Sequence, residues 1–416
     1  MFQRAPVPYC LGSLYPSIEG TKGAQPNFRR KFVSTISRKA VKGIALAAAS
    51  ALVLAGCAAA PEEETADNSD TGSSETETET EVETVDYKAC MVSDEGGFDD
   101  ASFNEEAFNG LQRAESELGV ETAAVESNTG ATLTEYSSAI ESLVGEGCDM
   151  VFGVGFALAT AIRDAAIANP DTDFALIDSA LSNDDFSPLS LENVKPIQYD
   201  TAEAAFLAGY LAAATTETGT VATYGGILFP TVTIFMDGFK QGVDYYNAEK
   251  GTDVQVLGAM DEDMANWSAT GDFSDIAKGK NLSEQFIDQG ADIVLPVAGP
   301  VGQGTGQASL DSEGVLLIGV DSDWYNLDAH AEYKQNILTS IEKKMSDAVF
   351  NVIQTGVDGT FVGGDENQYV GNLANGGVRI SPEHDVAYPA GIQAELDALA
   401  DQIIAGELVV NSIYKN

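Results

Sequence analysis

From residue 87 onwards, short apolar runs of strand type alternate with stretches of helical periodicity, and this alternation limits the fold more than any other feature. The first set has strand-type runs at residues 89–93, 120–125, 149–154 and 174–177, with helices expected at 103–118, 133–144 and 158–169. The second set has runs at 220–224, 254–257, 293–297 and 315–320, with helices near 234–247 and 275–289. Strands separated by helices predict parallel sheets, because parallel neighbours need a crossover connection, usually a helix.

Glycines at positions 209, 225 and 226 interrupt the pattern between the two sets. We therefore expect an α/β fold of two lobes, each a doubly wound parallel sheet covered by helices. The first lobe is expected at about residues 87–200 with part of the C-terminal region, and the second at about residues 215–340. Ligands of such sheets bind beyond the carboxyl ends of the strands, so a small molecule is expected in a cleft between the lobes, which can close on it.

The segment between the first predicted strand and the first predicted helix is rich in glycine, acids and polar residues. Its sequence is Ser93-Asp-Glu-Gly-Gly-Phe-Asp-Asp-Ala-Ser-Phe-Asn104, which on pattern alone is compatible with a structural turn or with a binding site. Ser102 followed by Glu105 matches a capping box, in which a hydroxyl and a carboxylate bind the free N–H groups at a helix start. We therefore predict a capping box at Ser102.

Acidic residues outnumber basic ones by 65 to 21, which gives a formal net charge of −44. Such a chain is not a general nucleic-acid binder, because binding to a phosphate backbone needs clustered Lys and Arg. The charge is also divided unevenly along the chain. Residues 1–56 carry +7, residues 57–86 carry −11, and the remainder carries −40.

Residues 1–56 are predicted to be a leader that contains a secretory signal. Basic residues precede an apolar run at 43–56, which is shorter than the roughly 20 residues that span a bilayer. The run ends in Leu54-Ala55-Gly56-Cys57, which resembles the bacterial lipobox, whose cysteine is lipidated and becomes the mature N-terminus. The resemblance implies that Cys57 carries a lipid anchor, and stable anchoring needs more than one acyl chain.

Two further features of the N-terminal region follow from its composition. The signal is already complete without the residues that precede Val33, so we expect translation to start at Val33. Residues 57–86 are acidic and contain no aromatic side chain. They cannot bury enough apolar surface to offset the entropy lost on ordering, which predicts a flexible tether that leads to a folded domain at residues 87–416.

The four cysteines, at positions 10, 57, 90 and 148, are too few for a disulfide scaffold. Cys90 and Cys148 lie near the starts of the first and third predicted strands, which are neighbours in a doubly wound sheet. A disulfide and a pair of free buried thiols are both compatible with that placement. The two histidines, His330 and His384, offer little material for a zinc site or a His-based triad, and we expect no metal and no cofactor.

Several motifs of residues 87–416 occur in the order found in one known family. The segment that ends in Asp100-Ala-Ser-Phe-Asn104 is similar to the signature of the basic-membrane-protein (PnrA-like) family of ABC transporter substrate-binding lipoproteins. Later blocks of the family resemble Gly153–Phe156, Phe206–Tyr210, Met236–Val243, Phe273–Lys280, Gln289–Gly299, Gly319–Asp323 and Leu338–Lys343. The resemblance covers nearly all of the folded region and implies the two-lobed type I periplasmic-binding-protein fold.

The family binds purine nucleosides between its lobes, and the resemblance implies a role for each matching position. Asp94 and Asp178 are expected to bind the base, Phe103 to stack on it with Asn104 alongside, and Asp321 and Lys343 to lie at the ribose. The second stacking ring is expected to be Phe273 or Trp267. The implied ligand-binding residues are Asp94, Phe103, Asn104, Asp178, Phe273, Trp267, Gly299, Asp321 and Lys343.

The sequence departs from the family pattern at two positions. Asp99 stands where the family commonly has Asn, and Pro300 follows Gly299 where a second glycine is usual. The second change affects a loop expected near the ribose, so it bears on sugar specificity. Residues 299–306 do not form a phosphate-binding loop, since they lack both the Gly-Lys-Ser/Thr ending and the Gly-x-Gly-x-x-Gly spacing.

These residue types suit a nucleoside. Aromatic rings stack on a base, carboxylates accept hydrogen bonds from N–H and hydroxyl groups, and an acidic pocket repels phosphate. We therefore expect a lipid-anchored, extracytoplasmic protein of the cell membrane that delivers a purine nucleoside to an ABC permease and its ATPase. The alternatives are a sugar or another small polar ligand in the same fold, or a nucleoside sensor without transport. No convincing nucleophile–base pair indicates an enzyme.

Overall fold

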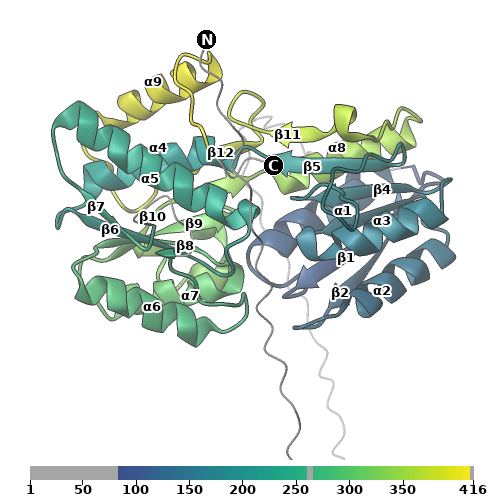
Figure 1. The fold of residues 1–416 in the computed structure, drawn as a ribbon, viewed down its shortest axis with the longest axis horizontal. Helices are drawn as coiled ribbons and strands as arrows, with labels where there is room; N and C mark the ends of the chain where they lie inside the picture. Colours follow the sequence, from purple (N-terminus) through teal and green to yellow (C-terminus); the bar gives the residue numbers. More distant parts are fainter. Residues whose placement is uncertain (1–82, 260–265, 413–416) are drawn as a thin grey trace, which may run out of the picture. The chain divides into compact units, whose positions relative to one another are not determined.

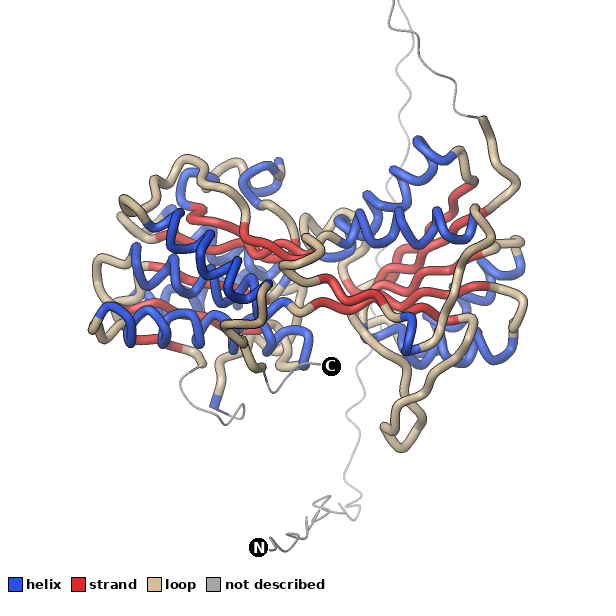
Figure 2. The backbone as a smooth tube through the Cα atoms, turned by 90° about the horizontal axis from the view of Figure 1, so that it is seen from above, coloured by secondary structure: helices blue, strands red, loops and turns tan. Residues whose placement is uncertain are grey.

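The computed structural model describes residues 83–259 and 266–412, and their strands form two sheets of six strands each (Figure 1). The predicted leader, the start at Val33, the lipidated Cys57 and nearly all of the predicted tether lie outside the described residues. Each sheet has helices on both faces, as Figure 2 shows from above. The expected pair of doubly wound lobes is therefore present.

The first sheet belongs to the N-terminal lobe and has the strand order β11-β5-β4-β3-β1-β2, with all neighbours parallel. Its strands are β1 (Lys88–Glu95), β2 (Glu121–Ser127), β3 (Met150–Val154), β4 (Asp173–Ile177), β5 (Val194–Tyr199) and β11 (Tyr369–Gly371). The sequence predicted four of them. It missed β5, in which Lys195 and Pro196 break the apolar run, and β11, which has only three residues.

The second sheet belongs to the C-terminal lobe and has the order β12-β10-β9-β8-β6-β7, in which only the β10–β12 pair is antiparallel among the described strands. Its strands are β6 (Thr220–Gly225), β7 (Gln255–Leu257), β8 (Ile293–Val297), β9 (Leu316–Asp321), β10 (Ile337–Lys343) and β12 (Val378–Ile380). The strand β10 was not predicted, although every one of its residues is buried, because its Thr, Ser, Glu and Lys hide the apolar run.

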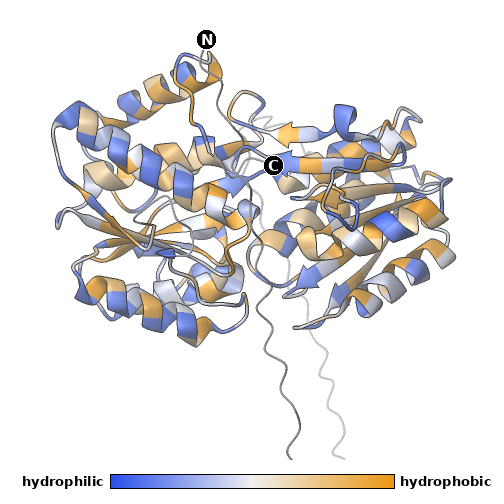
Figure 3. Cartoon of the chain, viewed as in Figure 1, coloured by the Kyte–Doolittle hydropathy of each residue, from blue (hydrophilic) through white to orange (hydrophobic). Residues whose placement is uncertain are grey.

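Helices connect the strands and cover the sheets. They are α1 (Phe103–Leu118), α2 (Leu133–Gly145), α3 (Ala159–Ala168), α4 (Thr201–Thr215), α5 (Pro230–Lys250), α6 (Ile276–Asp288), α7 (Gln303–Leu310), α8 (Met345–Val357) and α9 (Ile392–Ile404). Figure 3 shows the covering helices with hydrophilic and hydrophobic residues alternating along them. This is the mixed pattern expected of a helix that packs one face on a sheet.

Gly209 does not interrupt the structure as the sequence suggested, because it lies inside α4. A Cβ at this position would lie 2.0 Å from the carbonyl oxygen of Phe239 in α5, so only glycine lets the two helices pack this closely. Gly242 of α5 makes the reciprocal approach to Phe206 of α4. The glycine therefore marks a close helix–helix contact in the C-terminal lobe rather than a boundary between the lobes.

The chain passes between the two sheets three times: from β5 to β6, from β10 to β11, and from β11 to β12. Each lobe consequently contains strands from both halves of the sequence. The helix α8 follows β10 of the second sheet but packs in the N-terminal lobe against α1. In this contact, the guanidinium group of Arg113 in α1 lies 4.0 Å from the ring centre of Phe350 in α8. The two lobes are thus linked by three connections.

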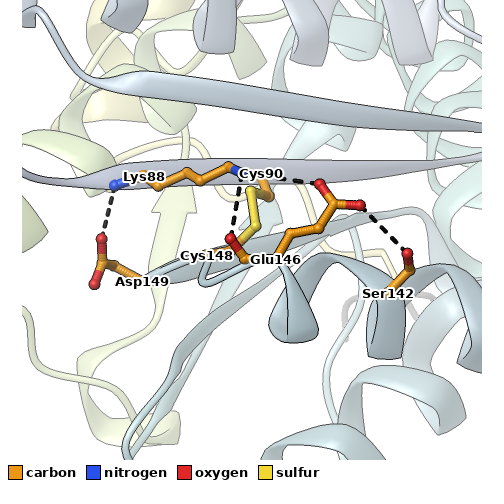
Figure 4. The surroundings of a disulfide bond; sticks show 6 residues. All are labelled: Lys88, Cys90, Ser142, Glu146, Cys148 and Asp149. Atoms are coloured by element: carbon orange, nitrogen blue, oxygen red, sulfur yellow. Dashed lines mark hydrogen bonds and ion pairs between the residues drawn. A yellow bond between two sulfur atoms is a disulfide. The ribbon is translucent and has the colours of Figure 1, made fainter.

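A disulfide joins Cys90 and Cys148 in the structure, with their Cα atoms 6.0 Å apart. Cys90 lies on β1, and Cys148 lies in the short loop that leads from α2 to β3, as Figure 4 shows. In the same loop, Asp149 accepts a hydrogen bond of 2.7 Å from the backbone N–H of Lys88. The disulfide therefore ties the central strand β1 to its neighbour β3, and both sulfur atoms lie within a buried apolar cluster.

Candidate functional site

A cavity of about 280 Å³ lies between the lobes, and residues at the carboxyl ends of strands from both sheets line it. This is the place where ligands of doubly wound sheets bind. The structure brings eight of the nine predicted ligand-binding residues into its wall: Asp94, Phe103, Asn104, Asp178, Phe273, Gly299, Asp321 and Lys343.

Trp267 is the predicted residue that does not line the cavity. Its side chain is only 7% exposed and packs in the main hydrophobic core. The sequence did not decide whether Trp267 or Phe273 is the second stacking ring, and the structure places Phe273 in the wall. Gly226 makes room for this ring, since a Cβ at that position would lie 2.4 Å from the edge of Phe273.

Asp94 and Asn104 form one side of the cavity and hold each other in place. The Asn104 side chain accepts a hydrogen bond of 3.1 Å from the Asp94 N–H and donates one of 2.9 Å to the Asp94 carboxyl. Burial raises the pKa of Asp94 to about 8, so its carboxyl holds a proton at pH 7. Residue 155 must be glycine, because a Cβ there would lie 2.3 Å from the other Asp94 oxygen.

The predicted capping box at Ser102 is wrong. Ser102 is the N-cap residue of α1, but its hydroxyl makes no capping hydrogen bond. Asp100 binds the helix start instead: its carboxylate accepts hydrogen bonds of 3.0 Å from the N–H groups of Ser102, Asn104 and Glu105, and another from the Asn104 side chain. Glu105 accepts from the N–H of Ala101, one residue before the expected partner.

Lys343 contributes a buried charge to the wall of the cavity. Its ammonium group lies 2.6 Å from the Asp178 carboxylate and 3.7 Å from that of Asp321. It also lies 4.8 Å from the centre of the Phe235 ring and 5.5 Å from that of Phe103, which are cation–π distances. Burial raises the pKa of Asp321 to about 6, although the charge of Lys343 opposes this shift.

Asp178 and Asp321 occupy equivalent places in the two lobes. Asp178 directly follows β4, and Asp321 is the last residue of β9. Both have a positive φ, of 58° and 68°, which an aspartate tolerates better than most residues. The strained backbone turns each carboxylate from its strand end towards the cavity that both residues line.

Sequence reasoning missed several apolar and aromatic residues of the wall. Phe156 follows β3, Phe229 precedes α5, and their ring centres are 4.0 Å apart across the two lobes. Phe235 of α5 and Tyr136 of α2 also line the cavity. The signal for Phe156 was present, because it ends a block that resembles the family, but no sequence pattern tells a wall ring from a core ring.

The wall combines these rings with five acidic side chains and one basic side chain among the described residues: Asp94, Glu95, Asp100, Asp178, Asp321 and Lys343. Such a cavity suits a flat, uncharged ligand with several hydrogen-bonding groups. Within the described residues, no group of three or more His, Cys, Asp or Glu side chains could hold a metal ion. In the same part of the chain, none of the helices has the length and apolar character needed to cross a bilayer.

Comparison with known proteins connects this site to a family. Residues 87–413 match the family described as "ABC transporter substrate-binding protein PnrA-like". The chain is 28% identical over 395 residues to the "ABC transporter nucleoside-binding protein BmpA" of Lactococcus lactis subsp. cremoris, a match that covers 91% of this chain and 100% of that protein. It is 30% identical over 334 residues to "Basic membrane protein A" of Borreliella burgdorferi, which covers 78% of this chain and 88% of that protein.

Among solved structures, a solute-binding protein of an ABC transporter system from Aeropyrum pernix is similar, with a TM-score of 0.63 and 26% sequence identity. The match covers 77% of this chain and 92% of that one. These similarities, together with the two sheets and the cavity between them, identify the two-lobed type I periplasmic-binding-protein fold. The chain belongs to the PnrA-like (basic membrane protein) family of ABC transporter substrate-binding proteins.

Proposed function

We propose that the cavity binds a purine nucleoside and that the protein delivers it to an ABC permease and its ATPase. The observation that carries this proposal is the composition of the wall, in which aromatic rings and buried carboxyl groups surround a cavity of about 280 Å³. Stacking on an aromatic ring contributes ~1–3 kcal/mol per base. The name of the similar Lactococcus lactis protein, which describes nucleoside binding, supports the same ligand class.

The protonation state of the wall suits a base better than a sugar alone. A protonated Asp94 can donate one hydrogen bond and accept another, which matches the mixed donors and acceptors on a purine edge. Asp178 holds Lys343 through one oxygen and keeps its other oxygen for the base. In this proposal, Phe103 and Phe273 stack on the base, while Asp321 and Lys343 bind the ribose hydroxyls near Gly299.

The charge of the wall also selects against nucleotides. Lys343 is its one basic side chain among the described residues, and the Asp178 carboxylate 2.6 Å away already neutralises it. A phosphate would therefore meet the carboxylates without a free cation to balance its charge. A nucleoside brings no such charge into the cavity.

Thermal-shift and calorimetric titration with guanosine, adenosine, inosine, their bases, their monophosphates and simple sugars tests this proposal. A ligand that binds only the folded protein raises Tm by mass action, so we expect a shift with at least one purine nucleoside and none with its monophosphate. A shift with a sugar, together with no shift for any nucleoside, would overturn it. Phe273→Ala should weaken nucleoside binding by about tenfold, whereas Trp267→Phe should not.

We further propose that Cys57 carries the lipid anchor and holds the domain on the extracytoplasmic face of the membrane. The support is the sequence Leu54-Ala55-Gly56-Cys57 and the family, whose members are substrate-binding proteins of transporters. Mass spectrometry of the N-terminal peptide of the mature chain should find an acylated Cys57, and metabolic labelling with palmitate should mark the protein. Cys57→Ala should abolish the label, and a label that persists in this variant contradicts the assignment.

A further inference from the structure

The hydroxyl group of Ser102 donates its hydrogen bond to the other lobe. Its Oγ atom lies 3.1 Å from an Asp321 oxygen at the end of β9, although Ser102 itself begins α1 of the N-terminal lobe. Both side chains are buried, with 1% and 7% of their surfaces exposed. A serine at an N-cap position normally binds the N–H groups of its own helix, so this orientation needs an explanation.

The Ser102 hydroxyl is not needed to cap α1. The Asp100 carboxylate already accepts from the N–H groups at the start of α1, so no capping bond is left for the serine to make. Between them, Ala101 has a positive φ of 53°, a left-handed conformation that is strained for an alanine. The turn is thus strained at Ala101, and the Ser102 side chain points to the opposite lobe.

The carbonyl group of Ala101 makes a second contact across the lobes. Its oxygen lies 3.3 Å from Nε2 of His330, and the other ring nitrogen of His330 lies 2.6 Å from the hydroxyl of Tyr333. A carbonyl can only accept, so Nε2 carries the hydrogen and Nδ1 accepts from Tyr333. His330 is 1% exposed and stacks on Trp324, with ring centres 4.3 Å apart, so its position in the C-terminal lobe is fixed.

We propose that these four residues form a clasp that couples lobe closure to occupation of the cavity. The clasp consists of Ala101 and Ser102 in the N-terminal lobe and Asp321 and His330 in the C-terminal lobe. Asp321 belongs both to the clasp and to the wall of the cavity. Ser102 is therefore a positioning residue: its hydroxyl orients the Asp321 carboxylate for the ligand, and it does so only when the lobes are closed.

The coupling follows from this shared carboxylate. When the lobes open, Asp321 loses the Ser102 donor, and the Ala101 carbonyl loses His330, so both sides must be solvated again. When the lobes close, the oriented carboxylate can accept hydrogen bonds from the ligand. The identity of that ligand rests on the proposed function, whereas the clasp itself concerns the closed state with or without ligand.

The experiment compares the full-length wild-type chain with Ser102→Ala, Asp321→Ala and the double variant. Isothermal calorimetry with guanosine, adenosine and inosine measures affinity, and small-angle scattering of the ligand-free protein measures lobe opening through the radius of gyration. We expect Ser102→Ala to weaken nucleoside binding about tenfold, the effect of losing one hydrogen bond to a charged group, mainly by faster dissociation. In the Asp321→Ala background the same change should have almost no further effect.

The matched control is Thr132→Ala, which removes the N-cap hydroxyl of α2 and should leave affinity within twofold. A second variant, His330→Phe, keeps an aromatic ring beside Trp324 but removes the hydrogen-bond donor to Ala101. We expect both Ser102→Ala and His330→Phe to enlarge the radius of gyration of the ligand-free protein. Equal affinity losses from Ser102→Ala with and without Asp321 would overturn the clasp. So would a ligand-free radius of gyration that neither Ser102→Ala nor His330→Phe changes.

These two measurements separate the clasp from the ligand assignment. If the wild-type chain binds no nucleoside, the proposed function fails, but the ligand-free scattering still tests the clasp. If nucleosides bind and Ser102→Ala changes neither affinity nor lobe opening, the clasp fails and the proposed function stands.

Discussion

Two helix starts in the N-terminal lobe have the same sequence pattern and different structures. At α2, Thr132 and Glu135 form a capping box: the Thr132 side chain accepts from the Glu135 N–H, and the Glu135 carboxylate accepts from the Thr132 N–H at 2.7 Å. At α1, Ser102 and Glu105 have the same spacing and form no such box. The difference is that Asp100 binds the N–H groups of α1, and the Ser102 hydroxyl contacts Asp321.

This comparison shows what a local motif can and cannot predict. A capping box is stable where nothing else competes for its hydroxyl, as at the exposed start of α2. At the start of α1, a buried carboxyl from the preceding turn and a carboxylate from the other lobe both compete. A failure of a local rule is expected where a site imposes its own geometry, and here the failure lies in the cavity wall.

The largest effect on stability should come from Asp100, whose carboxylate takes the place of the missing capping box at α1. Asp100→Ala removes the acceptor for three backbone N–H groups and one side-chain amide in a buried turn. We expect the free energy of unfolding, measured by urea denaturation, to fall by about 3 kcal/mol. The neighbouring Asp99 is exposed and serves as the matched control, so Asp99→Ala should change it by less than about 0.5 kcal/mol. Equal effects of the two changes would contradict the role of Asp100.

The next effect concerns Asp94, a part-buried carboxyl of this region that has no counterpart at α2. Because its pKa is raised from 3.8 to about 8, the folded chain retains a proton that the unfolded chain releases. Its contribution to stability is therefore full below pH 3.8 and is lost as the pH rises towards 8. Asp94→Asn keeps the contacts with Asn104 but does not ionise.

The Tm of Asp94→Asn should therefore exceed that of the wild type by about 2 °C or more at pH 7.5, and the difference should vanish near pH 4. Calorimetric scans across this pH range measure it, with Asp99→Asn as the exposed control. A difference that does not depend on pH would show that the Asp94 carboxyl ionises in the folded chain as readily as in the unfolded chain.

The smallest expected effect is the difference in the free energy of unfolding between removing the Thr132 hydroxyl and removing the Ser102 hydroxyl. Thr132→Ala removes a working N-cap and should lower the free energy of unfolding by about 1 kcal/mol, as N-cap replacements typically do. Ser102→Ala removes no capping bond and should lower it by less than half of that. The order is reversed for ligand affinity, so urea denaturation and calorimetry on the same two variants test the comparison directly.

The sequence allowed prediction of the repeated strand–helix units but not of the elements that link the lobes. Strands such as β3 and β8 are continuous apolar runs, which local pattern identifies. β10 has a polar sequence because Glu342 pairs with Arg379 of β12, and Lys343 reaches across to Asp178. Those partners come from distant parts of the chain, so no local window contains the reason for the strand.

The candidate site shows the same division. Family motifs located eight of the residues that line the cavity, and most of these, such as Phe103 and Asp321, lie at a strand end or a helix start. They did not indicate the ion pair between Lys343 and Asp178, whose atoms are joined only when the lobes meet. They also did not distinguish Phe273 from Trp267, since both are aromatic residues of the segment between β7 and α6 and only packing separates wall from core.

The three passages of the chain between the sheets have a consequence for genetic engineering. Neither lobe is encoded by one continuous stretch, because β11 of the first sheet follows β6 to β10 of the second, and β12 then completes the second sheet. A truncation after β5 would leave the first sheet without its edge strand β11 and without α8, which packs on α1. Chimeras with relatives therefore need at least three matched junctions, one for each passage, to exchange a lobe intact.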